Sequence, residues 1–429
     1  MDIQRDSFGN RFSPGLPYAR GHIIESGADE FGKLAQARRL MAGHMAGGGP
    51  ESLFNLSGLE RGMTVEPREI YNDELSPALY GEQLTKLAIQ HLGGDESTHD
   101  VLLLNRQSAA LLTSMMVLIE RGDTIVGASV GYSHPAVTRP ASLLGARFID
   151  SNGLSEFESV MDRESHVDLV VLTRLAVSYE ILPLADINRI LEIAQDRSIP
   201  VLVDDAGGAR VGPAVYGQPR TLELGVALGS TGLDKYGTQG PRLGLLGGRK
   251  DLISAARTRA FEFGLEARPM LYPIVARHLA EYSEDRVRDQ ARTTVALGEA
   301  LEAELGSCVR RNEISVKVPS EEILRLAMQR AHLADAPIVP YEALAVISMV
   351  LLREHGVLTV HFAGLPPGTS QLLFKLVSPD TLERFGGPRK LASAINSAID
   401  QLSEMLSDPA SIRELLLGTA VGDGEVVLR

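Results

Sequence analysis

The chain between residues 100 and 248 alternates short aliphatic runs with stretches whose apolar residues recur at helical spacing. Seven runs predict strands, at residues 100–105, 123–128, 146–150, 167–173, 199–205, 225–231 and 243–248. The stretches between them, such as Asp186–Arg197, are typical of amphipathic helices. Strands that are aliphatic almost throughout, and that alternate with helices, favour a mainly parallel sheet covered on both faces.

One predicted helix conflicts with its own sequence. The stretch His134–Ala146 has helical character but contains Pro140, which lacks an N–H and crowds the preceding turn. We therefore expect a kink or a break at Pro140.

Two changes of pattern divide the chain. Residues 1–50 are glycine-rich and irregular apart from one helix-like stretch, and they predict an N-terminal arm. Residues 51–275 contain the strand and helix alternation and predict a large domain. Residues 276–429 mix a few strands, a turn at Gly364–Ser370 and long helices, so they predict a smaller α+β domain.

Composition excludes several classes of function. The formal net charge is -13 and no long basic run occurs, so a nucleic-acid partner is not expected. The single cysteine, Cys308, cannot form a disulfide or a thiolate metal cluster within one chain, and no metal is expected. No apolar run has the length of a membrane span and the N-terminus lacks a signal-peptide core, which favours a cytoplasmic protein.

Polar residues follow several of the predicted strands. In an open parallel sheet, ligands bind at the carboxyl ends of the strands. There the chain has Arg106–Ser108 at the start of a helix, Tyr132 and His134 in a loop, Asp204–Asp205, and Lys235 in a glycine-rich segment. Each residue alone has an ordinary structural explanation, such as a helix cap or a surface charge. Chance explains the occurrence of all four at the ends of strands of one sheet less well.

This combination is what pyridoxal 5'-phosphate requires. A lysine amine forms a Schiff base with the aldehyde of this cofactor, and a carboxylate keeps its pyridine nitrogen protonated. A helix N-terminus suits the phosphate, and a flat ring can stack on the pyridine. Lys235 is the candidate amine, and either Asp204 or Asp205 is the candidate carboxylate.

The motifs LLLNRQSAALL, VLVDDAGGARVG and STGLDKYGTQGPRLGLLGGRKDLI resemble the fold-type I pyridoxal-phosphate enzymes. Within that superfamily they are most similar to bacterial selenocysteine synthase, to D-glucosaminate-6-phosphate ammonia-lyase and to uncharacterised archaeal homologues. The similarity extends from about Asn55 to Gly264, with a weaker one near Gly364–Ser370. It implies a seven-stranded, mainly parallel sheet domain with a smaller C-terminal domain.

The resemblance also implies roles for individual residues. Lys235 would form the Schiff base and move protons, and Asp204, with Asp205 as the rival, would pair with the pyridine nitrogen. The residues expected to contact the cofactor are Arg106, Gln107, Ser108, His134, Asp204, Ser230, Thr231 and Lys235. The residues expected to contact the substrate are Arg242, Arg174 and Lys375.

The reaction implied is α/β elimination or β-replacement on a small amino acid or amino sugar acid, through an external aldimine and a quinonoid. An aminotransferase, or a cofactor-binding protein that has lost catalysis, remains an alternative. The short, weakly basic N-terminal arm differs from the tRNA-binding domain of selenocysteine synthase and argues against a tRNA substrate. Because enzymes of this fold build their sites at a subunit interface, a homodimer or larger homo-oligomer is expected.

Overall fold

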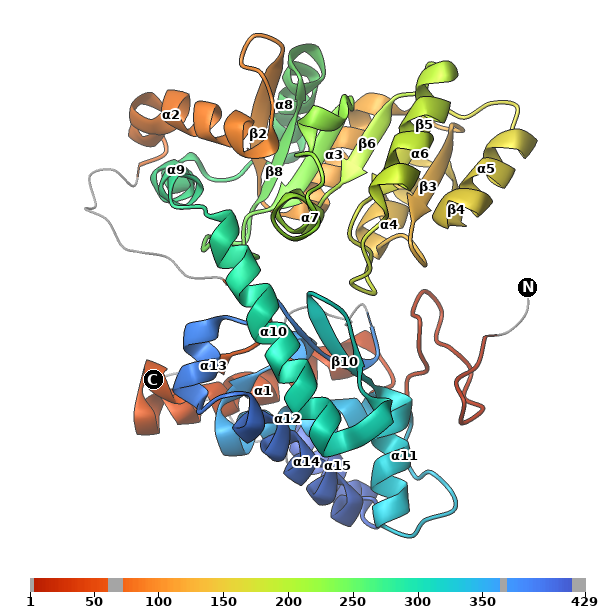
Figure 1. Ribbon diagram of the computed structural model, residues 1–429, viewed down its shortest axis with the longest axis vertical. Coiled ribbons are helices and arrows are strands. Elements are labelled where there is room, and N and C mark those ends of the chain that lie inside the picture. The colour runs from red at the N-terminus through yellow and green to blue at the C-terminus, as the bar shows by residue number, and fades with distance from the viewer. Residues whose placement is uncertain (1–3, 61–71, 363–368, 419–429) are drawn as a thin grey trace. The chain divides into compact units, whose positions relative to one another are not determined.

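The computed structural model describes residues 4–60, 72–362 and 369–418, and Figure 1 shows the chain. It divides into two compact units, one of Met1–Gly58 with Asp289–Arg429 and one of Leu59–Arg288. The sequence-based boundaries at residues 50 and 275 differ from these. The first 58 residues belong to the same unit as the C-terminal part of the chain, and the second boundary lies at Asp289. No helix of the described residues is long and apolar enough to cross a membrane.

The unit Leu59–Arg288 contains one seven-stranded sheet in the order β2-β8-β7-β6-β5-β3-β4 (Figure 1). Its strands are β2 (His99–Leu104), β3 (Thr124–Ser129), β4 (Arg147–Asn152), β5 (Leu169–Thr173), β6 (Val201–Asp204), β7 (Leu228–Gly232) and β8 (Gly244–Arg249). The strands run parallel except β8, which is antiparallel to both of its neighbours. The predicted seven-stranded, mainly parallel sheet is thus confirmed.

Alternate residues along each strand enter hydrophobic clusters on opposite faces of this sheet. In β5, Leu169 and Val171 pack with α3, α4 and α8, whereas Val170 and Leu172 pack with α2, α5, α6 and α9. The helices are α2 (Leu75–Leu92), α3 (Gln107–Leu118), α4 (Pro135–Leu144), α5 (Gly153–Arg163), α6 (Leu184–Asp196), α8 (Lys250–Phe263) and α9 (Tyr272–Ala280). This two-sided burial explains why the strands are aliphatic throughout.

Pro140 does not end its helix. Helix α4 continues from Pro135 to Leu144 with Pro140 inside it, so the expected break is absent. Pro140 is buried beside Val137 and Ala141, which belong to the core cluster with α3 and α8. Packing of this face therefore outweighs the loss of one backbone hydrogen bond.

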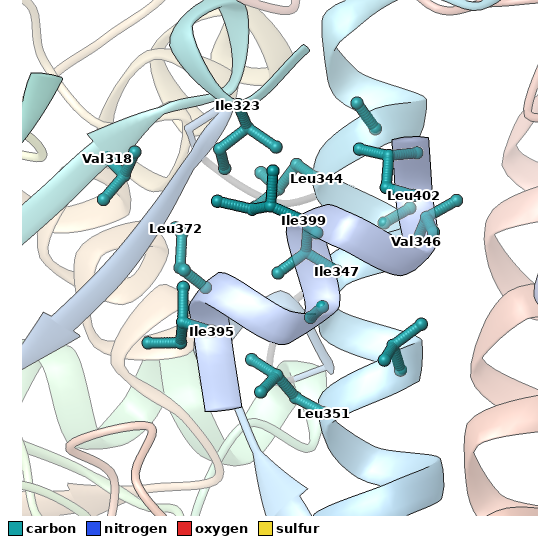
Figure 2. Packing of buried hydrophobic residues seen from close by; sticks show 14 of the residues in the cluster. Val318, Ile323, Leu344, Val346, Ile347, Leu351, Leu372, Ile395, Ile399 and Leu402 are labelled. Carbon is teal, nitrogen blue, oxygen red and sulfur yellow. The ribbon is translucent and has the colours of Figure 1, made fainter. Parts of the chain in front are cut away.

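The other unit is built around α12 (Pro340–His355), a helix that is buried along most of its length. In Figure 2, Leu344, Ile347 and Leu351 of α12 face Ile395 and Ile399 of α14 (Pro388–Met405). A three-stranded antiparallel sheet, β12-β10-β9, completes it together with α11 (Ser320–Arg330). The strands are β9 (Arg310–Arg311), β10 (Ser315–Pro319) and β12 (Gln371–Lys375).

The remaining elements of this unit come from both ends of the chain. They are α1 (Gly27–Gly48), β1 (Phe54–Asn55), most of α10 (Glu284–Leu305), β11 (Val357–Leu358), α13 (Pro379–Phe385) and α15 (Pro409–Leu417). Strands β1 and β11 pair in parallel, which joins the N-terminal segment to residues three hundred positions later. The predicted turn at Gly364–Ser370 lies mostly outside the described residues.

A buried polar cluster attaches α1 to α12. The Lys33 ammonium is fully buried and contacts three acceptors, namely Glu30 Oε2 at 2.8 Å, Tyr341 Oη at 2.9 Å and His361 Nε2 at 2.9 Å. Tyr341 in turn donates to Glu30 Oε1 at 2.5 Å. Burial lowers the pKa of Lys33, and the adjacent Glu30 carboxylate opposes that shift. The N-terminal segment is therefore part of the core of this unit.

We expect Lys33→Met to destabilise this unit by about 3–5 kcal/mol, because it leaves the Glu30 carboxylate buried without its cation. Urea unfolding of the purified protein measures the change. The double variant Glu30→Gln with Lys33→Met should recover a large part of the loss, since the stranded charge is then gone. A loss below about 1 kcal/mol in the single variant would contradict an ion pair in this cluster.

Candidate active site

Three polar side chains lie side by side where β5, β6 and β7 end. Thr173 pairs in register with Asp204, and Asp204 pairs with Ser230. All three residues are buried. Because these strands are parallel, their carboxyl ends meet at one edge of the sheet, as the sequence predicts.

Asp204 is held from the start of α3. The amide nitrogen Nε2 of Gln107 lies 3.2 Å from Asp204 Oδ1, 2.8 Å from Ser230 Oγ and 3.0 Å from the Ser230 carbonyl oxygen. This approach depends on Gly244 of β8, where a Cβ atom would lie 2.5 Å from the Arg106 carbonyl oxygen. Gln107 thus donates a side-chain hydrogen bond to the Asp204 carboxylate. It is also the first residue of α3.

The pKa of Asp204 is raised to about 6, chiefly because the carboxyl is buried. The hydrogen bond from Gln107 and the charge of Lys235 both oppose that rise, and the neighbouring Asp205 adds to it. The carboxyl is therefore ionised at neutral pH, although burial makes its charge costly.

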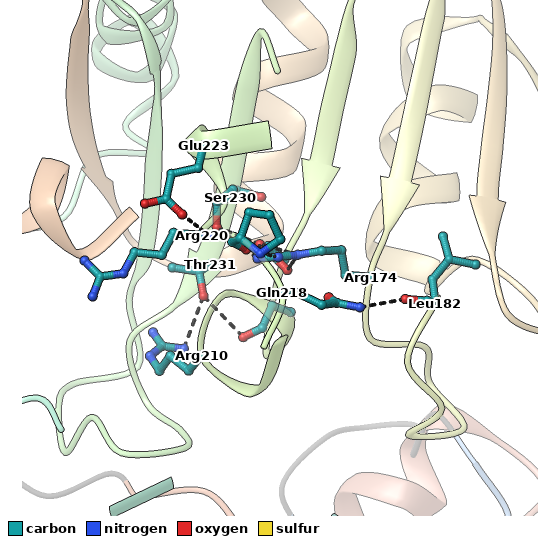
Figure 3. A network of polar contacts seen from close by, with 12 residues as sticks. Arg174, Leu182, Arg210, Gln218, Arg220, Glu223, Ser230 and Thr231 are labelled. Carbon is teal, nitrogen blue, oxygen red and sulfur yellow. Dashed lines mark hydrogen bonds and ion pairs between the residues drawn. The ribbon is translucent and has the colours of Figure 1, made fainter. Parts of the chain in front are cut away.

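Asp205 belongs to a different contact network. Its carboxylate forms an ion pair with Arg174, which is fully buried, and accepts a hydrogen bond of 2.6 Å from Thr221 Oγ1. Arg174 also donates to the Pro219 carbonyl oxygen at 2.6 Å. Figure 3 shows Arg174 within this network of polar contacts. Of the two candidate carboxylates, Asp204 is therefore the one that lies with Gln107 and Ser230.

This ion pair also bears on a predicted role. Arg174 was expected to bind substrate, but its side chain is fully buried and engaged by Asp205. Releasing the guanidinium would leave the Asp205 carboxylate buried without a counter-charge. We therefore assign Arg174 to the support of the sheet and do not propose it as a substrate ligand.

Lys235 lies in a loop that is fixed by its own neighbours. The Thr238 hydroxyl donates to the Leu233 and Lys235 carbonyl oxygens, at 3.1 and 2.9 Å. A Cβ atom at Gly232 would lie 3.0 Å from Lys235 Cε, so the stem of the lysine passes directly over this glycine. Because position 232 has no side chain, the Lys235 side chain can pass close to its backbone.

Thr231 is oriented by an arginine that the sequence did not single out. Arg210 of α7 (Gly208–Tyr216) is fully buried and lies 3.2 Å from Thr231 Oγ1 and 2.6 Å from the Gly232 carbonyl oxygen. Figure 3 shows the contact of Arg210 with Thr231. Thr231 and Ser230 are adjacent on β7, so their side chains point to opposite faces of the sheet. Thr231 is therefore separated from the Asp204 cluster.

The predicted phosphate turn, Arg106–Ser108, begins α3. Its N-cap residue is Arg106, and no side chain caps this end of the helix within the described part of the chain. His134 lies beyond the carboxyl end of β3 and caps α4, with Nδ1 accepting from the Ala136 N–H at 2.9 Å. Its ring is exposed.

Two further residues were predicted to contact the substrate. Arg242 is exposed in the connection between β7 and β8. Lys375 lies on β12, in the other compact unit.

Buried polar atoms near the strand ends add Ser129 and Thr173 to the residues expected to contact the cofactor. Among the described residues, Thr173 Oγ1, Ser129 Oγ and Gln107 Oε1 are buried and have no hydrogen-bond partner. Ser129 and Thr173 are the last residues of β3 and β5, and those strands are neighbours. Both could have been found from the sequence, since each is a hydroxyl residue that directly ends an aliphatic run.

No family model matches the chain. The chain is 30% identical over 405 residues to a UPF0425 pyridoxal phosphate-dependent protein of Methanothermobacter thermautotrophicus, covering 92% of this chain and 100% of that protein. It is 28% identical over 338 residues to a protein of the same description from Methanosphaera stadtmanae, covering 78% of this chain and 85% of that one.

Solved structures are similar in fold. Alanine–glyoxylate aminotransferase from Nostoc sp. has a TM-score of 0.55 and 16% identity, over 82% of this chain and 95% of that one. Serine palmitoyltransferase of Sphingomonas wittichii has a TM-score of 0.55 and 15% identity, over 86% of this chain and 84% of that one. At such identities the similarity shows the fold alone, and it confirms the predicted fold-type I class.

The raised pKa of Asp204 predicts how the cofactor-free protein responds to pH. A buried carboxyl whose pKa rises from 3.8 to about 6 loses stability as the pH rises through that interval, by about 3 kcal/mol at most. Asp204→Asn lacks this loss, so it should be more stable than the unaltered protein at pH 8, with a smaller difference at pH 5. Urea unfolding at the two pH values measures both.

The neighbouring residue provides the control for this measurement. Asp205→Asn breaks the ion pair with Arg174 and should destabilise the protein by about 3–5 kcal/mol. Equal effects of the two substitutions would contradict the assignment of the two aspartates to different environments.

Proposed function

Because the chain belongs to the UPF0425 family of pyridoxal phosphate-dependent proteins, we propose that it is an enzyme that uses this cofactor on a small amino acid or amino sugar acid. The reaction proposed is α/β elimination or β-replacement, without a tRNA substrate. The observation that carries the proposal is the Asp204 carboxylate, buried beside Gln107 and within the electrostatic influence of Lys235.

The residues at the strand ends fit the cofactor. Pyridoxal phosphate presents a ring nitrogen, a ring hydroxyl, an aldehyde and a phosphate, and each needs a different partner. The partnerless atoms Thr173 Oγ1, Ser129 Oγ and Gln107 Oε1 supply unused hydrogen-bonding capacity at this edge. The N-terminus of α3 supplies backbone donors and the positive end of a helix dipole.

Asp204 and Lys235 have the central roles. When bound, pyridoxal phosphate withdraws electrons from the bonds at the substrate's α carbon. Asp204, ionised at neutral pH and buried, would hold the proton on the ring nitrogen. Lys235 would hold the cofactor covalently through Nζ, and after release of that nitrogen it would move a proton to or from the substrate.

The other predicted contacts have more limited roles. Residues Arg106–Ser108 would bind the phosphate through their backbone, with Ser230 oriented toward the same edge by Gln107. His134 would cover the exposed face of the ring. Thr231 would act through the backbone of β7, because its hydroxyl meets Arg210 on the other face of the sheet.

Substrate recognition falls to the loops that follow the strands. Arg242 is exposed in the segment after Lys235 and would bind a carboxylate or a phosphate of the substrate. Lys375 remains a second candidate for the same group. A planar guanidinium binds a carboxylate at two points, which favours Arg242 over Lys375.

We also propose a homodimer or larger homo-oligomer and a cytoplasmic location. The first rests on the fold class, whose members share sites between subunits. The second rests on the lone cysteine, which agrees with a reducing compartment.

We expect Lys235→Ala to abolish the visible absorption band of the bound cofactor, because Lys235 is the amine proposed to hold the aldehyde. Absorption spectra of the purified proteins measure this after incubation with pyridoxal phosphate. Lys250→Ala, which removes an exposed lysine at the start of α8, serves as the matched control and should keep the band. A full band in Lys235→Ala would overturn the proposed site.

A screen of amino acids and phosphorylated amino sugar acids then separates the reactions. Release of a keto acid and ammonia without a second keto acid identifies elimination. A requirement for an added keto acid identifies an aminotransferase instead. Bound cofactor with no turnover of any substrate class would favour a binding protein.

A further inference from the structure

Two tyrosines adopt a backbone conformation that tyrosine rarely adopts. Tyr236 directly follows Lys235 and has φ 52°, and Tyr179, in the connection between β5 and α6, has φ 64°. The left-handed region is sterically unfavourable for a residue with a bulky side chain. Such residues persist where surrounding contacts hold them, and they concentrate at functional sites.

The two side chains meet each other. The Tyr179 and Tyr236 hydroxyl oxygens lie 2.9 Å apart, so one hydroxyl donates to the other. Tyr236 is buried. Burial raises the pKa of both hydroxyls, so both keep their protons at physiological pH and the hydrogen bond between them is preserved.

Gly207 makes this meeting possible. A Cβ atom at position 207 would lie 2.4 Å from ring carbon Cε2 of Tyr236 and 3.0 Å from the Leu175 side chain. Gly207 follows Asp204 by three residues. The Tyr236 ring therefore packs against the backbone that leaves β6, directly beyond the buried carboxylate.

The segment that carries Tyr179 is itself ordered. Leu175 and Ile181 form an antiparallel bridge, and the Ala176 N–H donates to the Glu180 carbonyl oxygen at 3.0 Å. The Tyr179 N–H donates to the Ala176 carbonyl oxygen at 2.9 Å. A tight turn thus presents the Tyr179 hydroxyl from a fixed position.

From these contacts we infer that Tyr179 and Tyr236 are positioning residues for Lys235. The hydroxyl pair, with the Tyr236 ring seated on Gly207, holds the backbone after Lys235 in its left-handed turn. Thr238 fixes the carbonyl side of the same loop. The direction in which the lysine leaves the loop is then set by the segment after β5 as well as by β7. This inference rests on the proposed role of Lys235.

The test removes one hydroxyl at a time, in Tyr179→Phe and Tyr236→Phe. The first readout is the rate of Lys235 reductive methylation in the cofactor-free protein as a function of pH, followed by mass spectrometry. The second is the rate constant at which added pyridoxal phosphate generates its absorption band. We expect each variant to lower that rate constant by about five- to tenfold, as the loss of one hydrogen bond predicts. The pH profile of Lys235 methylation should shift as well, while exposed Lys250 keeps its profile.

The double variant, Tyr179→Phe with Tyr236→Phe, tests whether the two hydroxyls act together or independently of each other. Because one hydrogen bond joins the hydroxyls, the double variant should be no slower than the single variants. Gly207→Ala, which displaces the Tyr236 ring and keeps both hydroxyls, should slow attachment in the same way. Tyr272→Phe on α9 is the matched control, because it also removes one tyrosine hydroxyl but leaves the loop of Lys235 unchanged. This variant should attach the cofactor at the unaltered rate.

The outcomes distinguish this inference from the proposed function. If Lys235→Ala loses the band but both phenylalanine variants attach the cofactor and methylate normally, the positioning role is wrong and the site stands. Multiplicative slowing in the double variant would also overturn the pair. If Lys235→Ala keeps the band, the proposed function itself fails.

Discussion

The buried carboxylate of Asp204 is the constraint around which the candidate site is organised. Burial makes its charge costly, and the surrounding residues reduce that cost by a hydrogen bond from Gln107 and by the charge of Lys235. Because β6 lies in the middle of the sheet, the contributing residues come from α3 and from the loop after β7. The position of the carboxylate thus determines which segments of the chain must converge.

The adjacent aspartates show how one strand end serves two purposes. Successive side chains of a strand point to opposite faces, so Asp204 and Asp205 enter different surroundings. Asp205 is neutralised by Arg174 and accepts a hydrogen bond from Thr221, and the ion pair attaches the segment after β5 to the end of β6. Asp204 is less fully satisfied and keeps its capacity to interact with a ligand. A buried ion pair thus lies at the same strand end as the carboxylate that Gln107 contacts.

Much of this could be predicted from the sequence. The seven strands were recognisable because both faces of the sheet are buried, which makes each strand aliphatic, and the strand ends then located Asp204, Gln107 and Lys235. What could not be predicted depends on the direction of side chains in space. The choice between Asp204 and Asp205, the burial of Arg174 and the meeting of Tyr179 with Tyr236 all follow from distant segments. Pro140 remained helical for the same reason, since the packing of α4 is not encoded locally.

The position of β8 determines when β2 can join the rest of the sheet. Strand β2 pairs with no strand of the sheet other than β8, and β8 is the last of the seven in the chain. During synthesis, β2 therefore has no strand partner in this sheet until the ribosome has released residues 244–249. The remaining strands can pair earlier, because each of them follows or precedes a parallel neighbour. A truncated chain that ends before Gly244 therefore retains Gln107, the aspartates and the lysine but lacks the strand that joins β2 to β7.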